Sequence, residues 1–94
     1  MALVWSARAK RDVRDIGLYI AQHDQTAAAA IVKRIVATAD RLDEYPELGR
    51  LGRVNDTREL LVPGARYIVV YRIGRRNVRI VAVMHTSRKW LTTF

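Results

Sequence analysis

Apolar residues recur at helical spacing in the first half of the chain, and they cluster in short, strand-like runs in the second half. One stripe, in segment 6–21, consists of Ala9, Val13, Ile16 and Ile20. A second stripe, in segment 27–42, consists of Ala28, Ile31, Ile35, Ala39 and Leu42. Steps of three and four residues put each stripe on one face of a helix. The short link between the segments predicts an antiparallel helical hairpin.

Capping and small residues support both helices. Ser6 offers an N-cap to the first helix, and Asp24 or Thr26 offers one to the second. Gly17 inside the first helix costs about 1 kcal/mol relative to alanine. Its presence predicts that another element approaches closely at that point.

The remaining apolar runs predict strands. The predicted strands are 2–5, 57–62, 66–73 and 78–85. Pro46 and Gly49 end the second helix and open a loop over 46–56, and turn residues separate the later strands. The order strand, helix, helix, strand, strand, strand indicates an α+β fold with a two-helix hairpin packed on a small, mostly antiparallel sheet. Ninety-four residues predict a single domain, 1–94.

A tight turn at 74–77 sets the expected register of the last two strands. One face is wholly apolar and is expected to lie under the helices. Its predicted pairs are Ile73–Val78, Tyr71–Ile80, Val69–Ala82 and Tyr67–Met84. The other face has an apolar centre with cationic ends. Its predicted pairs are Arg72–Arg79, Val70–Val81, Ile68–Val83 and Arg66–His85.

This second face predicts a docking groove. Opposed arginines repel each other unless an anion lies between them, and an exposed apolar strip commonly marks an interface. The groove would bind an apolar segment flanked by carboxylates through Arg66, Ile68, Val70, Arg72, Arg79, Val81, Val83 and His85. The alternative is that residues 46–56 fold across the same face. A partner strand is also able to add at an edge formed by 2–5 or 57–62.

Charge is unevenly distributed along the chain. The formal net charge is +8, and residues 45–94 contribute +7 of it. Arginine supplies 14 of the 17 cations, and its guanidinium recognises carboxylate and phosphate through paired hydrogen bonds. The pattern favours an acidic protein or a nucleic acid as partner, with a basic surface kept for solubility as the alternative.

Several classes of site and location are disfavoured. The chain has no cysteine, so no disulfide or cysteine-based metal site is expected. Neither His23 nor His85 has a second metal ligand at useful spacing, and no cofactor motif is present, so we expect neither metal nor cofactor. We see no signal peptide and no run of the roughly 20 apolar residues that a membrane span needs. A soluble, cytoplasmic protein is expected.

Motifs distributed along the chain resemble the ParE/RelE superfamily of bacterial type II toxins. They are Ser6, Ala9, Asp12, Val13, Ile16 and Tyr19, then Pro46, Gly49 and Arg50, then Arg58, Glu59 and Leu60, then Tyr67, Tyr71 and Arg72, and finally Val83, His85 and Arg88. The resemblance implies the fold derived above. It also implies that the acidic partner of the docking groove is a cognate antitoxin, in a toxin–antitoxin hetero-oligomer.

The superfamily divides by activity. The Pro-x-x-Gly-Arg loop, the Arg-Glu-Leu strand and the Val-x-His-x-x-Arg ending are more similar to the ParE branch, which implies inhibition of DNA gyrase without catalytic residues. The alternative is a RelE-type, ribosome-dependent mRNA endonuclease. Its candidate catalytic residues are Glu59, Arg66, Arg72, His85 and Arg88. A further alternative is a chain that has lost toxicity and only binds its partner or regulates their promoter.

The sequence leaves individual roles open. Glu59 would act as the base only if it faces the same side as His85, and His85 would otherwise simply end a strand. Candidate target contacts are Arg75, Arg76, Arg88, Lys89 and Trp90. For these the alternatives are a solvated turn at 75–76 and packing of Trp90 in the core or against a partner.

Overall fold

The predicted order of elements is confirmed, with two short additions. The computed structural model describes residues 1–87. Its elements are β1 (Ala2–Trp5), α1 (Ala7–Ala21), α2 (Gln25–Asp40), the 3₁₀ helix η1 (Arg41–Asp43), β2 (Arg50–Leu51), β3 (Arg58–Leu61), β4 (Tyr67–Ile73) and β5 (Asn77–His85). Both η1 and β2 lie where the sequence predicted a helix end and a loop.

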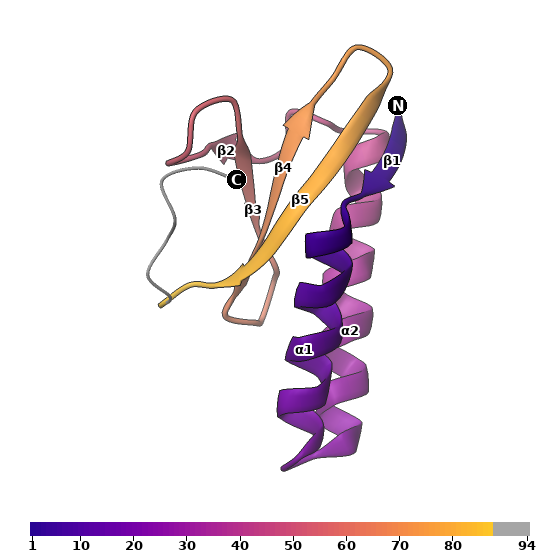
Figure 1. The fold of residues 1–94 in the computed structure, drawn as a ribbon, viewed down its shortest axis with the longest axis vertical. Helices are drawn as coiled ribbons and strands as arrows, with labels where there is room; N and C mark the ends of the chain where they lie inside the picture. The colour runs from indigo at the N-terminus through magenta and orange to yellow at the C-terminus, as the bar shows by residue number, and fades with distance from the viewer. Residues whose placement is uncertain (88–94) are drawn as a thin grey trace.

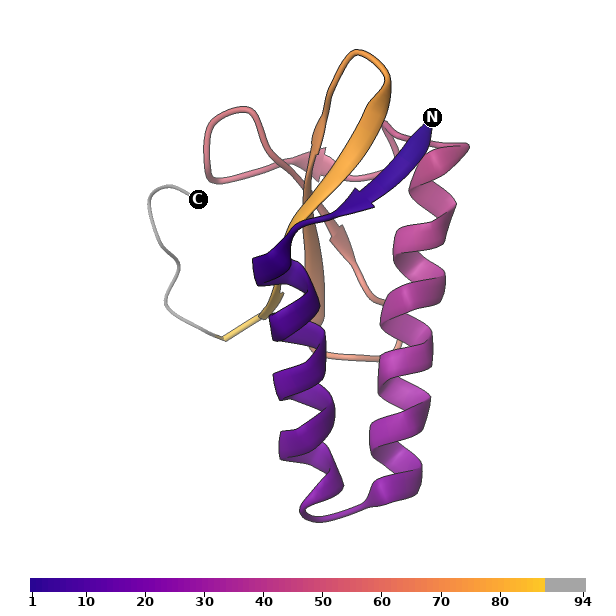
Figure 2. The ribbon, with the colours of Figure 1, turned by 45° about the vertical axis from the view of Figure 1, so that its right-hand side comes forward.

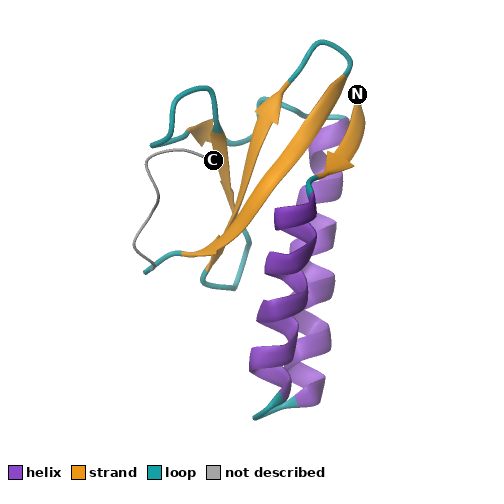
Figure 3. Cartoon of the chain, in the orientation of Figure 1, coloured by secondary structure: helices purple, strands orange, loops and turns teal. Residues whose placement is uncertain are grey.

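The strands form one sheet in the order β1-β5-β4-β3-β2 (Figure 1). Only β1 runs parallel to its neighbour, β5; the other pairs are antiparallel. The two helices lie side by side against one face of this sheet (Figure 3). The α+β class and the mostly antiparallel sheet are therefore as predicted.

The local signals that predicted the helices are present as contacts. The Ser6 hydroxyl accepts a hydrogen bond from the Ala9 N–H at 3.0 Å, and the Asp24 carboxylate accepts one from the Ala27 N–H at 2.9 Å. A Cβ at Gly17 would lie 3.1 Å from a Val32 methyl carbon, so the glycine permits close approach of α1 and α2. The hairpin extends well beyond the sheet at its loop end (Figure 2).

The main core lies between the helices and the sheet. Ile35 and Leu42 from the second stripe are fully buried there against Tyr71, Val78 and Ile80. Replacing a buried residue of this size by alanine typically costs 2–5 kcal/mol. The core therefore depends on the same stripes that predicted the helices.

Beyond the point where β1 ends, a side chain of α1 and the side chain of its N-cap form hydrogen bonds with the backbone of β5. The Ser6 hydroxyl donates to the Val81 carbonyl at 3.1 Å, and the Asp12 carboxylate accepts from the Val83 N–H at 2.9 Å. Arg8, one turn before Asp12, lies 3.5 Å from the same carboxylate. Two polar side chains thus satisfy backbone groups that a neighbouring strand would otherwise bind.

The register of β4 and β5 is partly different from the prediction. The pairs nearest the turn, Ile73–Val78, Arg72–Arg79 and Tyr71–Ile80, are as predicted. A β-bulge then leaves Val81 as an extra residue, and the following pairs are Val70–Ala82, Val69–Val83, Ile68–Met84 and Tyr67–His85. The predicted pairs Val70–Val81, Ile68–Val83, Val69–Ala82, Tyr67–Met84 and Arg66–His85 are wrong. A bulge sets two residues of one strand opposite one of the other and so shifts everything beyond it.

The bulge also changes which residues share a face. Val83 packs toward the helices, in the main core. The opposite face carries a second apolar cluster formed by Ile68, Val70, Val81, Ala82 and Met84. Its members are at most 6% exposed, so the predicted open apolar strip is wrong.

The segment 46–56 contributes to closing this second face. Arg50 and Arg53 reach Glu59 on β3, and Leu48 lines a pocket together with Ile68. This arrangement favours the alternative that the segment folds against the face.

Candidate partner-binding surfaces

Glu59 is a buried charged side chain in the middle of β3. It lies opposite Val70, on the face away from the helices, and its side chain is 2% exposed. It accepts hydrogen bonds from the Arg50 guanidinium at 3.1 Å, from the Arg53 amide at 2.9 Å and from the Arg53 guanidinium at 3.3 Å. Burial raises the pKa of Glu59, but the bonds from Arg53 and Arg50 outweigh it and hold the pKa below its usual value.

His85 occupies a different environment at the end of β5. Its ring packs edge-on against Tyr67, with centroids 5.3 Å apart. Its Nδ1 accepts a hydrogen bond from the Ser87 N–H at 3.1 Å and lies 2.7 Å from the Ser87 hydroxyl. Tyr67 packs against the main core, so His85 lies on the helix side of the sheet.

The structure does not bring the candidate catalytic residues together. Glu59 and Arg72 lie on the face away from the helices, whereas His85 lies on the other. Arg66 is exposed and precedes β4, where its carbonyl accepts from the Thr86 N–H. Arg88 falls outside the described residues. A carboxylate with a lowered pKa that already accepts three hydrogen bonds is also a poor proton acceptor.

A leucine-lined pocket lies beside the outer edge of β3. It has a volume of about 340 Å³, and its apolar lining is formed by Leu48, Leu60, Leu61 and Ile68. Arg50 and Arg53 form its cationic side, next to Glu59. Strand β2 pairs with β3 only at Arg58 and Glu59, so within residues 1–87 it leaves the β3 edge at Leu60 and Leu61 unpaired. We call this the β3-edge pocket; sequence reasoning missed it, apart from the suggestion that 57–62 offers a strand edge.

The loop before β2 is held by hydrogen bonds that are buried or partly buried, and these fix the shape of this pocket. The Tyr71 hydroxyl donates to the Pro46 carbonyl at 2.7 Å and accepts from the Gly49 N–H at 2.8 Å. Burial raises the pKa of Tyr71, which keeps the phenol protonated as a donor. The Arg58 guanidinium donates to the Gly49 carbonyl at 2.8 Å. The Pro-x-x-Gly-Arg motif thus has a structural role.

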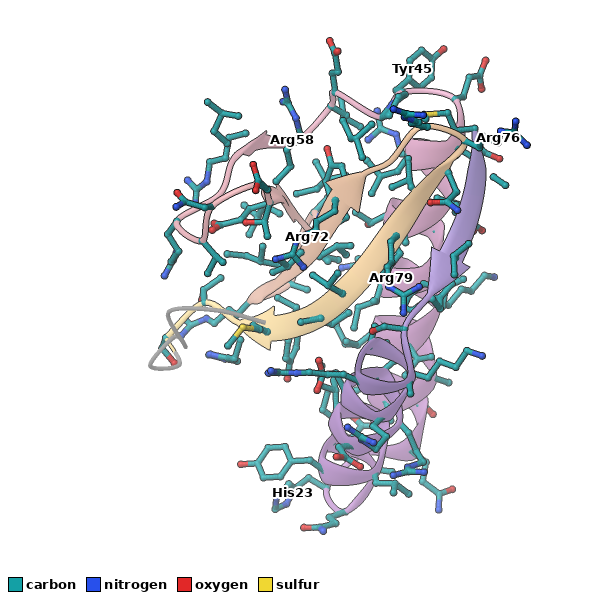
Figure 4. The ribbon with its side chains drawn as sticks, turned by 45° about the horizontal axis from the view of Figure 1, so that its top comes forward. His23, Tyr45, Arg58, Arg72, Arg76 and Arg79 are labelled. Atoms are coloured by element: carbon teal, nitrogen blue, oxygen red, sulfur yellow. The ribbon has the colours of Figure 1, made fainter. Side chains whose placement is uncertain are left out.

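The arginine end of the β4–β5 hairpin consists of Arg72, Arg75, Arg76 and Arg79. Arg72 and Arg79 are direct cross-strand neighbours on the face away from the helices, as the sequence predicted (Figure 4). Arg75, Arg76 and Arg79 are exposed, and Arg72 is half-buried. Of the predicted target contacts, Arg75 and Arg76 lie at this turn, and Lys89 and Trp90, like Arg88, lie outside the described residues.

Comparison with known proteins shows the family of this chain. A sequence model of the ParE toxin of type II toxin–antitoxin systems, parDE, matches residues 3–90. The chain belongs to the ParE toxin family. It is therefore the toxin of a type II toxin–antitoxin system, and the resemblance found in the sequence motifs is confirmed.

Curated relatives of this ParE family chain carry toxin names. It is 46% identical over 86 residues to a Sinorhizobium fredii protein named "Putative toxin Y4kP", covering 92% of this chain and 88% of that protein. It is 36% identical over 86 residues to toxin RelE2 of Caulobacter vibrioides, covering 92% and 96%. Toxin RelE1 of the same organism is 32% identical over 83 residues, covering 85% and 87%.

A solved structure shares the fold of this ParE family chain. A chain of the chromosomal ParDE toxin–antitoxin system from P. aeruginosa superposes with a TM-score of 0.83 at 21% identity, covering 93% of this chain and 97% of that one. Within residues 1–87, no helix is long and apolar enough to cross a membrane. The same residues contain no group of three His, Cys, Asp or Glu side chains placed to hold a metal ion.

Proposed function

We propose that this toxin inhibits DNA gyrase and that a cognate antitoxin with an acidic, apolar segment neutralises it. The observation that carries the proposal is the combination of ParE family membership with the separation of Glu59 from His85 on opposite faces of the sheet. An inhibitor acts through a binding surface and needs no acid–base pair. The proposal also accounts for the net charge of +8, which attracts acidic proteins.

The β3-edge pocket is the proposed docking site for the antitoxin segment. Leu48 and Leu61, which line this pocket, are 40% and 58% exposed, and the unpaired edge at Leu60 and Leu61 offers backbone groups for a partner strand. Arg50 and Arg53 supply two cations against the single carboxylate of Glu59, so an acidic segment complements the pocket. This location replaces the predicted groove, whose apolar centre is buried.

The second candidate is a RelE-type mRNA endonuclease. It is favoured by the names of the two Caulobacter relatives. Its cleavage step would need the separated residues Glu59 and His85 to work with substrate-supplied or ribosome-supplied groups.

One paired experiment separates the candidates. Purified toxin is added to gyrase with relaxed plasmid, and separately to programmed ribosomes with mRNA. We expect supercoiling to be blocked, mRNA to stay intact, and antitoxin to restore supercoiling. A His85→Ala variant should keep its inhibition, whereas an enzyme using His85 would lose roughly 10²-fold in rate. Untouched supercoiling with cut mRNA would overturn the gyrase proposal.

The docking site is tested in the same assay. Leu61→Glu should still block supercoiling but should resist neutralisation by the antitoxin, because it puts a carboxylate where an acidic segment binds. The matched control is Leu18→Glu on α1, since Leu18 is 61% exposed and lies on a different surface. Equal neutralisation of both variants would place the antitoxin elsewhere.

A further inference from the structure

The geometry points to a second binding function: we propose that the arginine end of the β4–β5 hairpin binds the phosphate backbone of duplex DNA. This inference goes beyond gyrase inhibition and does not depend on it. It rests on the charge distribution, on one cross-strand pair and on the small exposed apolar surface of residues 66–87.

Acidic residues are missing from the whole C-terminal part of the sequence. All nine Asp and Glu residues lie at or before Glu59. Strands β4 and β5 and their turn therefore carry cations without any carboxylate of their own. Four of these cations, Arg72, Arg75, Arg76 and Arg79, lie within a stretch of eight residues on one hairpin.

The cross-strand pair at the arginine end of the hairpin is electrostatically unfavourable. Arg72 and Arg79 are direct cross-strand partners, and like charges in that position destabilise a sheet. Asp56 lines the same pocket of about 480 Å³ as Arg72, but the ion pairs formed within residues 1–87 include neither arginine. An anion from outside the chain relieves the repulsion, and a phosphate accepts two guanidinium groups well.

The side chains of the hairpin itself favour a phosphate backbone over an acidic protein. A protein partner normally anchors through an apolar or aromatic group that becomes buried in the interface. Among residues 66–87, Ile73 is the sole exposed apolar side chain, at 39%. The exposed Leu51 of β2 lines the pocket that Arg72 and Ile73 also line, to the side of the hairpin. On the hairpin itself, Tyr71 is fully buried and Tyr67 lies on the helix side. The ring of Tyr67 also packs against His85, whereas binding of single strands uses exposed aromatic rings that stack on bases. Figure 4 shows Arg72 and Arg79 projecting from neighbouring strands, with Arg76 beyond them at the turn.

Binding of this kind has a quantitative signature. Each phosphate that a protein neutralises contributes about 0.9 to the slope of log Kobs against log salt for duplex DNA. The full-length toxin is titrated with a fluorescent duplex of about 20 base pairs, between about 50 and 200 mM salt, where phosphate contacts dominate. Three double variants are compared, each with a formal net charge of +6 in place of +8.

Because the three variants have the same net charge, comparing them distinguishes a specific binding site from an effect of overall charge. R72Q/R79Q removes the cross-strand pair, R75Q/R76Q removes the turn arginines, and the control R11Q/K33Q removes two exposed helix cations. We expect each hairpin variant to flatten the slope by about 1.8 and the control to leave it unchanged. Far-UV circular dichroism checks that R72Q/R79Q is folded, and R75Q/R76Q lies in a turn where no strand pairing is disturbed.

Three results would overturn the proposal. One is a slope that neither hairpin variant changes, and another is an equal flattening by R11Q/K33Q. The third is tighter binding of a single-stranded RNA of the same length, or of a polyglutamate peptide, with the same dependence on Arg72 and Arg79. The RNA result would assign the surface to another nucleic acid, and the peptide result would assign it to a protein.

Discussion

At the β2–β3 end of the sheet, Arg50 and Arg53 share the buried carboxylate of Glu59, whereas at the β4–β5 end Arg72 and Arg79 face each other with no ion pair to residues 1–87. Both pairs lie on the face away from the helices. One arrangement closes a loop onto the sheet, and the other leaves two positive charges side by side.

The difference separates a structural use of arginine from a binding use. Glu59 fixes segment 50–53 at one side of the β3-edge pocket, because its carboxylate accepts hydrogen bonds from one backbone amide and two guanidinium groups. The hairpin gains nothing comparable from Arg72 and Arg79, since their mutual repulsion opposes folding. Substitutions should therefore act in opposite directions at the two ends.

The largest expected effect is a loss of stability in Glu59→Gln. The amide cannot accept charge-assisted bonds from both arginines, and the Arg53 N–H loses a strong acceptor. Hydrogen bonds to charged groups contribute about 1.5–3 kcal/mol each, and the arginines regain water because they are 69% and 45% exposed. We expect the free energy of unfolding to fall by about 2 kcal/mol, measured by urea denaturation.

The control for this variant is Glu44→Gln, which changes the same charge at an exposed residue outside the cluster. Exposed substitutions of this kind usually stay within about 0.5 kcal/mol. Similar losses in both variants would mean that net charge, rather than the Glu59 cluster, sets stability.

A second, smaller effect is expected on acidification. The pKa of Glu59 is lower in the folded chain than its ordinary value, because the hydrogen bonds from Arg53 and Arg50 outweigh burial. The resulting stabilisation is complete above the unfolded pKa of about 4.3, and it is lost as the pH falls through the folded pKa. The difference in unfolding free energy between the wild type and Glu59→Gln should therefore shrink below about pH 4. A difference that stays constant to about pH 3 would show that the charge of Glu59 contributes nothing.

Periodic patterns predicted the fold because they are set by local geometry. The stripe that contains Ile35 and Leu42, the caps at Ser6 and Asp24 and the close approach at Gly17 all follow from helical spacing and backbone chemistry. The first three cross-strand pairs beyond the turn followed from its position. The bulge at Val81 was not predictable, because a continuous apolar run gives no signal that one residue lacks a partner.

The site was less predictable than the fold because it depends on contacts between distant segments. No local pattern indicates that Glu59 is buried between Arg50 and Arg53, or that Asp12 binds the Val83 amide. The opposed pair of Arg72 and Arg79 was predictable, since it lies before the bulge. The β3-edge pocket required the path of segment 46–56, which only the tertiary structure supplies.

The smallest expected effect is a gain of stability in Arg79→Glu. It is also the most direct test of the difference between the two arginine pairs. The substitution turns a repulsive cross-strand pair with Arg72 into an attractive one, for which opposite charges contribute about 0.2–1 kcal/mol. We expect the free energy of unfolding to rise by about 0.5 kcal/mol while the salt slope of DNA binding flattens. The control Arg76→Glu changes the same charge at the turn, outside the paired residues, and should lose binding without gaining stability. A residue whose removal stabilises the fold and weakens binding is retained for its ligand, and destabilisation by Arg79→Glu relative to Arg76→Glu would contradict that role.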